Sequence, residues 1–139
     1  MEKLRADRRN YKNAFKAHAN AYDQWNIGSD NSRRLILCYC VECGLKCLIM
    51  ENDSIFRISQ ANEETKAALG SHDFRMLLKK VNQAGNYIFK QFVTEYGETV
   101  IPSKYHQLCR YKIAPKEIND LNEFDDTLVQ IKEWLKEVI

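Results

Sequence analysis

The sequence predicts an all-α protein with a single domain over residues 1–139, and three observations lead to this prediction. Apolar residues recur three and four positions apart along most of the chain, which is the spacing of one helix face. No segment alternates apolar and polar residues as a half-buried strand does, so no strand is predicted. Only five glycines and two prolines interrupt the chain, and 45% of its residues are hydrophobic, which suits one globular core.

A first helix is expected from about Lys3 to Trp25. Its apolar residues recur at helical spacing and would form one buried stripe, made of Tyr11, Phe15, Ala19 and Tyr22. Residues 26–31 follow as a predicted turn, because this stretch is rich in helix-breaking and N-capping residues, among them Gly28, Ser29 and Asp30.

The central helix is expected over residues 35–50, which read LILCYCVECGLKCLIM. A membrane span needs about 20 apolar residues, whereas this run is shorter and carries two charges, so we interpret it as a buried core helix. Glu42 and Lys46 lie four positions apart and are predicted to pair along one edge of it. Gly44 weakens a helix interior, which indicates close approach of a neighbouring helix or subunit at this point.

The middle of the chain is predicted to hold shorter helices. Residues 51–70 form a less regular connection with one helical piece at 63–69. Residues 71–73, Ser-His-Asp, are typical of a helix start, and that helix is expected to end at Gly85. A further helix is expected over residues 86–96, because apolar side chains recur there at helical spacing.

The last part of the chain is divided by two prolines. Pro102 and Pro115 bracket the segment SKYHQLCRYKIA, which can hold about two turns of helix. The final helix is expected from about Leu121 to the C-terminus, with one apolar stripe made of Phe124, Leu128, Ile131, Trp134, Leu135 and Val138.

Charge does not direct the whole protein to a polyanion, because the formal net charge is only +2. The N-terminal stretch is locally basic, with Lys3, Arg5, Arg8, Arg9, Lys12 and Lys16 against Glu2 and Asp7. Two interpretations stay open: a solvated helix face, or a nucleic-acid-binding surface that uses Arg5, Arg8, Arg9 and Lys12. The first residues lack the apolar segment of a secretory signal, so a soluble, cytoplasmic protein without membrane contact is predicted.

Four of the five cysteines crowd into the central helix, at Cys38, Cys40, Cys43 and Cys47. At 100° per residue Cys38 points almost opposite to the other three, so one straight helix cannot wrap the set around a metal ion. Free cysteine is among the most buried residue types, and core packing is the expected role. No metal and no cofactor are predicted.

One histidine and one arginine are the candidate catalytic residues. His106 and Arg110 lie four positions apart, so a helix would project both from one face. Metal-independent RNA cleavage needs a group that moves protons and a cation that holds the phosphate, although surface neighbours without a role would show the same spacing. His72 is interpreted as part of a helix cap, with catalysis as the alternative, and His18 is given no role. Phosphate loops, nucleophile elbows and H-E-x-x-H motifs are absent from the sequence.

Three segments occur in a characteristic order: YCVECGLKCLIM at residues 39–50, SHDFRMLL at 71–78 and YHQLCRY at 105–111, which ends in Arg-Tyr before the last helix. Together they resemble the HEPN family of prokaryotic helical domains. The resemblance covers most of the chain from about Asn13 onward. It implies an up-and-down four-helix bundle with one or two extra short helices, often assembled as a dimer.

The resemblance also bears on function. Active HEPN ribonucleases carry an arginine followed four to six residues later by histidine, whereas here no histidine follows Arg110. The resemblance therefore implies an interaction module without its own catalysis in a bacterial antiviral-defence or toxin–antitoxin assembly. Its partner would be an effector, a toxin or a second copy of the chain, with RNA as a further ligand. Two alternatives remain: a metal-independent endoribonuclease using His106 and Arg110 in reversed order, and a soluble immunity protein that occludes a toxin.

Overall fold

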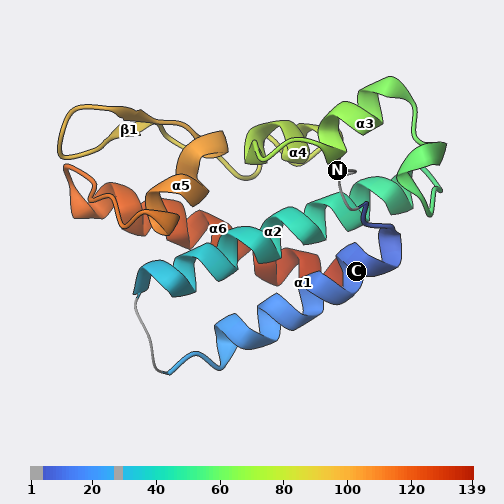
Figure 1. Cartoon of the computed structure of the whole chain (residues 1–139), viewed down its shortest axis with the longest axis horizontal. Coiled ribbons are helices and arrows are strands. Elements are labelled where there is room, and N and C mark those ends of the chain that lie inside the picture. The colour runs from blue at the N-terminus through green and yellow to red at the C-terminus, as the bar shows by residue number, and fades with distance from the viewer. Residues whose placement is uncertain (1–4, 27–29) are drawn as a thin grey trace.

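A computed structural model describes residues 5–26 and 30–139 of the chain (Figure 1). Over these residues three long helices form the body of the fold: α1 (Arg8–Asp23), α2 (Asp30–Asn52) and α6 (Ile118–Val138). Three short helices lie in series along the remaining side of α2: α3 (Glu63–Leu69), α4 (Phe74–Lys80) and α5 (Tyr105–Arg110). The predicted all-α bundle with extra short helices is therefore confirmed.

The helix starts follow from local capping. Asp7 accepts a hydrogen bond from the Asn10 amide at 2.9 Å, and Asn10 Oδ1 accepts one from the Asp7 amide at 2.9 Å. This capping box begins α1 at Arg8. The start expected at Lys3 lies outside the described residues, as do Gly28 and Ser29 of the predicted turn. α2 already includes Asp30, so it is longer than the stretch 35–50.

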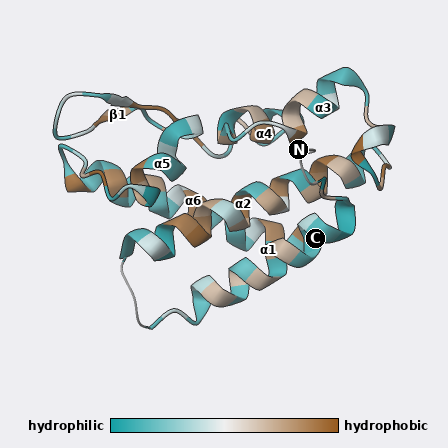
Figure 2. Ribbon diagram, viewed as in Figure 1, coloured by the Kyte–Doolittle hydropathy of each residue, from teal (hydrophilic) through white to brown (hydrophobic). Residues whose placement is uncertain are grey.

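Three helices meet at Gly44, where the sequence predicted the close approach of a neighbouring helix or subunit. A Cβ atom placed there would lie 2.7 Å from Phe15 Cδ1 of α1 and 2.7 Å from Leu135 Cδ1 of α6. Both side chains are buried in the core cluster. Glycine therefore allows α1 and α6 to approach α2 closely. In Figure 2 hydrophobic segments recur along α2 and α6, whereas α1 is mostly hydrophilic on the side in view.

The helix expected over residues 86–96 is wrong. Asn82 takes a left-handed conformation (φ 60°) after α4, and the chain then turns and runs extended into β1 (Phe92–Val93). β1 pairs antiparallel with β2 (Thr99–Val100), so a small hairpin also corrects the absence of strands in the sequence-based prediction. Phe89 and Phe92 of this stretch belong to the core, and the Phe89 and Phe124 ring centroids are 4.6 Å apart, whereas Tyr96 is exposed.

α5 is anchored to both α2 and α6. The Tyr105 ring stacks on Phe124 with centroids 3.7 Å apart, and its hydroxyl donates to Asp125. The other Asp125 oxygen accepts from Arg34 Nε of α2 at 2.5 Å. The two-turn helix between the prolines is thus confirmed, and its first residue is fixed by buried aromatic and polar contacts. Among the described helices, none is long and apolar enough to cross a membrane.

Candidate functional site

The three segments that carry the family resemblance converge on one polar surface. α2, the start of α4 and α5 contribute side chains that contact one another across 30 to 71 residues of sequence. We call this group the histidine cluster, and it consists of Tyr39, Glu42, His72, His106 and Arg110.

Local structure fixes the position of His72. Asp73 caps α4 by accepting a hydrogen bond from the Arg75 amide at 3.0 Å. The Asp73 amide in turn donates to Ser71 Oγ at 3.0 Å. His72 is therefore part of a capping segment, as the sequence suggested, but its ring also faces α2, where it meets Glu42. The cap thereby serves to place a ring beside α2.

Glu42 links a surface ring to a buried cation. Its Oε1 atom lies 2.7 Å from His72 Nδ1, and its Oε2 atom lies 3.3 Å from Lys46 Nζ. The predicted Glu42–Lys46 pair is thus confirmed, and Lys46 is only 5% exposed. The His72 side chain is 57% exposed, so its ring stays in contact with solvent while Nδ1 faces the carboxylate.

His106 lies beside His72, with ring centroids 5.2 Å apart and ring planes at 48°. Burial lowers the pKa of His106 below its ordinary value, and the neighbouring His72 and Arg110 lower it further. Glu42 opposes this pKa shift without reversing it. A lowered pKa keeps His106 neutral at pH 7, which is the state that accepts a proton.

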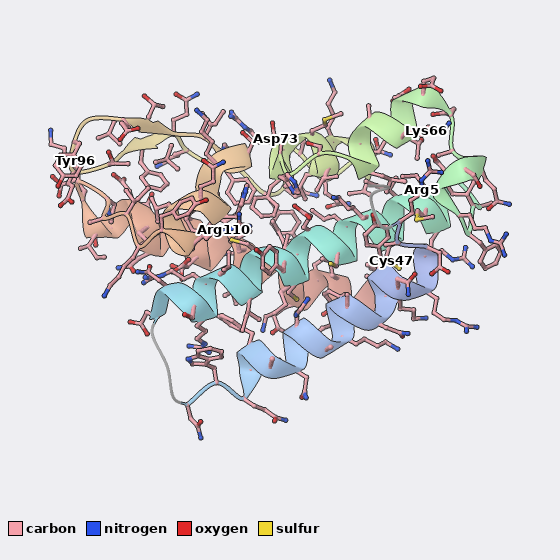
Figure 3. The ribbon with its side chains drawn as sticks, viewed as in Figure 1. Arg5, Cys47, Lys66, Asp73, Tyr96 and Arg110 are labelled. Carbon is pink, nitrogen blue, oxygen red and sulfur yellow. The ribbon has the colours of Figure 1, made fainter. Side chains whose placement is uncertain are left out.

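Arg110 completes the cluster at the last turn of α5. Its Nη2 atom donates to the Tyr39 hydroxyl of α2 at 3.0 Å, and hydrogen bonds to Tyr39 and Tyr111 raise its pKa. Figure 3 shows Arg110 between α5 and α2. The guanidinium is thus oriented by tyrosine hydroxyls while it stays in contact with solvent, where it can meet an anion.

The cysteines take no part in this site. Cys38, Cys40, Cys47 and Cys109 are buried, Cys43 is half-buried, and all five are free. Burial raises the pKa of Cys40 to about 12 and that of Cys47 to about 11, so both thiols are poor nucleophiles at pH 7. The predicted packing role is confirmed for Cys38, Cys40 and Cys47, while Cys43 of the same helix is only half-buried. In the described part of the chain, no group of three or more histidine, cysteine or acidic residues is placed to hold a metal ion.

The basic N-terminal residues lie apart from the histidine cluster. Arg5, Arg8, Arg9 and Lys12 gather where the start of α1 meets the turn after α2. The Arg8 guanidinium there lies 3.7 Å from the centroid of the Phe56 ring. The structure therefore separates the two groups of residues that the sequence singled out.

The sequence indicated three of the five residues of the histidine cluster, namely His106 and Arg110 as a pair and His72 as an alternative to its capping role. Spacing alone brought together His106 and Arg110, and it paired Glu42 with Lys46 but assigned neither to a site. Tyr39 and Glu42 sit three positions apart on one helix, which is a weak signal. The contact of Glu42 with His72 joins residues 30 positions apart and is set by tertiary packing.

The fold and this site define a small all-α protein with a surface cluster of two histidines, a carboxylate and an arginine. No family model matches the chain, and no curated protein or solved structure matches it either.

Proposed function

We propose that this chain is a HEPN-like helical protein that cleaves RNA without a metal ion at the histidine cluster. One observation carries the proposal: the rings of His72 and His106 lie 5.2 Å apart, with Arg110 on the same helix as His106. Two groups that move protons beside one cation are what cleavage of a phosphodiester bond requires.

The reaction assigns a role to each side chain. Neutral His106 takes the proton from a ribose 2′-hydroxyl, and the freed oxygen attacks the adjacent phosphorus. The bond from phosphorus to O5′ breaks, and His72, oriented by Glu42, gives a proton to the departing O5′. Arg110 stabilises the negative charge that develops on the phosphate oxygens. The products are a 2′,3′-cyclic phosphate and a 5′-hydroxyl end.

The arrangement differs from the family pattern in a way that the fold explains. The second histidine comes from the α4 start, not from a position after Arg110. His72 is 34 residues before His106 in sequence, yet its ring is the neighbour of His106 in space. In this proposal His72 takes the role of the histidine that is missing after Arg110, whose absence weakened the nuclease prediction from sequence.

The test is incubation of the purified protein with labelled RNA in EDTA. Replacing a general acid or base lowers rates by about 10² to 10⁴. We therefore expect His72→Ala and His106→Ala each to reduce cleavage about a hundredfold or more, whereas Arg75→Ala, an exposed arginine of α4, should cleave like wild type. Inactive wild-type protein, or full activity in both histidine variants, would refute the proposal.

A second candidate is the interaction module without its own catalysis, and a specific observation favours it. Tyr111 is 65% exposed and directly follows Arg110. Tyrosine and arginine are enriched at the centres of protein interfaces. If this module pairs with a second copy, wild type should sediment as a dimer and Tyr111→Ala as a monomer. His106→Ala should remain a dimer. A monomer at all concentrations would contradict that form of the proposal.

A further inference from the structure

A concave surface lies where α1 begins and α2 ends, apart from the histidine cluster. It is a hollow of about 500 Å³, lined by Asp7, Arg8, Arg9, Lys12, Glu51, Phe56 and Arg57. A smaller hollow of about 250 Å³ adjoins it, shares Asp7 and Arg57, and adds Arg5. We call the larger one the basic hollow. Figure 3 places Arg5 and Cys47 near this end of the molecule.

The charges around the basic hollow favour an anion. Arg8, Arg9, Lys12 and Arg57 supply four cations against the two carboxylates of Asp7 and Glu51, and Arg5 adds a fifth next to them. The Asp7 carboxylate already accepts the Asn10 amide as the cap of α1. Glu51 accepts the Cys47 thiol at 3.7 Å. Both carboxylates thus have partners inside the protein.

Phe56 adds an aromatic surface that a purely ionic patch lacks. The Arg8 guanidinium covers one side of its ring at 3.7 Å from the centroid, yet the residue is 60% exposed. The turn that carries the ring is firmly held. Gln60 Oε1 accepts both the Phe56 amide at 2.8 Å and the Arg57 amide at 2.9 Å, and the Phe56 carbonyl accepts the Arg8 amide at 2.9 Å.

We propose that the basic hollow binds single-stranded RNA, with one base stacked on Phe56 and the backbone phosphates on Arg9, Lys12 and Arg57. An unpaired base is required, because a base inside a duplex has no free face to stack on an aromatic ring. The cations supply the sequence-independent part of binding. The proposal rests on the proposed function, since it names a binding surface for the same substrate class.

The geometry of α2 connects the two sites. Glu51 at the basic hollow and Glu42 in the histidine cluster are nine residues apart on one helix, which corresponds to about 13.5 Å along the axis and, at about 100° per residue, to half a turn around it. A strand that joins the two sites would therefore have to pass around α2 as well as along it.

The experiment measures binding without cleavage. A fluorescent single-stranded 2′-O-methyl RNA carries the same bases and phosphates but no free 2′-hydroxyl to attack, so its anisotropy reports affinity alone. Phe56→Leu should weaken binding about tenfold, and Phe56→Tyr, which keeps an aromatic ring, should bind like wild type. Arg9→Glu should weaken binding and reduce the dependence of the affinity on salt concentration. Lys90→Glu makes the same change of charge far along the sequence, and it should bind RNA like wild type.

The outcomes separate this proposal from the proposed function. Full binding by both Phe56→Leu and Arg9→Glu would overturn the basic hollow as an RNA site, even if the wild type cleaves RNA. Equal losses in Arg9→Glu and Lys90→Glu, with none in Phe56→Leu, would leave only general charge attraction and also overturn it. Specific loss of binding together with an inactive wild type would support the hollow and refute the nuclease.

Discussion

Removing the charge of Glu42 should reveal how the site and the stability of the fold are linked. Glu42 contacts Lys46 Nζ at 3.3 Å and His72 Nδ1 at 2.7 Å. Glu42→Gln keeps the size of the side chain but takes away the counter-charge of a lysine whose side chain is only 6% exposed. The buried ammonium would then lack its ionic partner, which is a costly state inside a protein.

The expected magnitude follows from distance and burial. Two unit charges at 3.3 Å attract by about 5 kcal/mol at an effective dielectric constant near 20. Breaking a fully buried pair costs about 3–5 kcal/mol. Glu42 is 18% exposed, so water replaces part of the interaction, and the amide oxygen of glutamine can still accept from Lys46. We therefore expect Glu42→Gln to lower the free energy of unfolding by about 2 kcal/mol.

Urea unfolding followed by circular dichroism measures this change, with the m-value as a check that the unfolded state is the same. Lys46→Met should cost less than Glu42→Gln, because Glu42 keeps His72 and access to water. The double variant should recover stability relative to Glu42→Gln, since it leaves no buried unpaired charge. An unfolding free energy of Glu42→Gln within about 0.5 kcal/mol of wild type, or a double variant less stable than Glu42→Gln, would refute this reasoning.

Three further outcomes are expected. Gly44→Ala should lower the free energy of unfolding in urea by about 1 kcal/mol, because overpacking among three helices outweighs the better helix propensity of alanine. Gly85→Ala has open space around its Cβ position, so it should be neutral or stabilising by about 0.5 kcal/mol. Asp73→Ala should cost about 1 kcal/mol through the lost α4 cap and should also reduce RNA cleavage by releasing the adjacent histidine. Because the pKa of His106 is lowered in the folded protein, the unfolded chain binds a proton at this histidine at a higher pH than the folded chain does. The free energy of unfolding should therefore fall as pH drops below 6.5. His106→Gln should show a smaller difference in the free energy of unfolding between about pH 7 and about pH 5 than wild type.

The sequence predicted α1 and α6 from their periodic apolar stripes and α2 from its long apolar run, and it failed where local backbone geometry decides. Residues 86–96 carry apolar side chains at helical spacing, but Asn82 turns the chain out of α4 in a left-handed conformation. The chain then packs Phe89 and Phe92 on Phe124 while Ile88 is 71% exposed. Spacing alone cannot tell which of these apolar residues meets the core, since that depends on α6.

The candidate site was likewise predictable from the sequence only in part. His106 and Arg110 were found because a helix brings residues four apart onto one face. Tyr39 and Arg110 are 71 positions apart, and their contact depends on how α5 is fixed to α2 through Asp125. Single-residue patterns hold no information on such a contact, so the tertiary partners of a predicted pair had to come from the structure.

The Glu42–Lys46 pair is better explained by positioning than by stability. A nearly buried ion pair can often be replaced by uncharged residues at little or no cost, so the fold alone does not require a carboxylate at this point of a core helix. The proposed chemistry does require it, because the same carboxylate orients His72 beside His106. The Glu42→Gln/Lys46→Met double variant should therefore combine near-native stability with impaired cleavage. Recovery of both properties together would mean that the carboxylate does not position the ring, and loss of cleavage alone would identify Glu42 as a positioning residue.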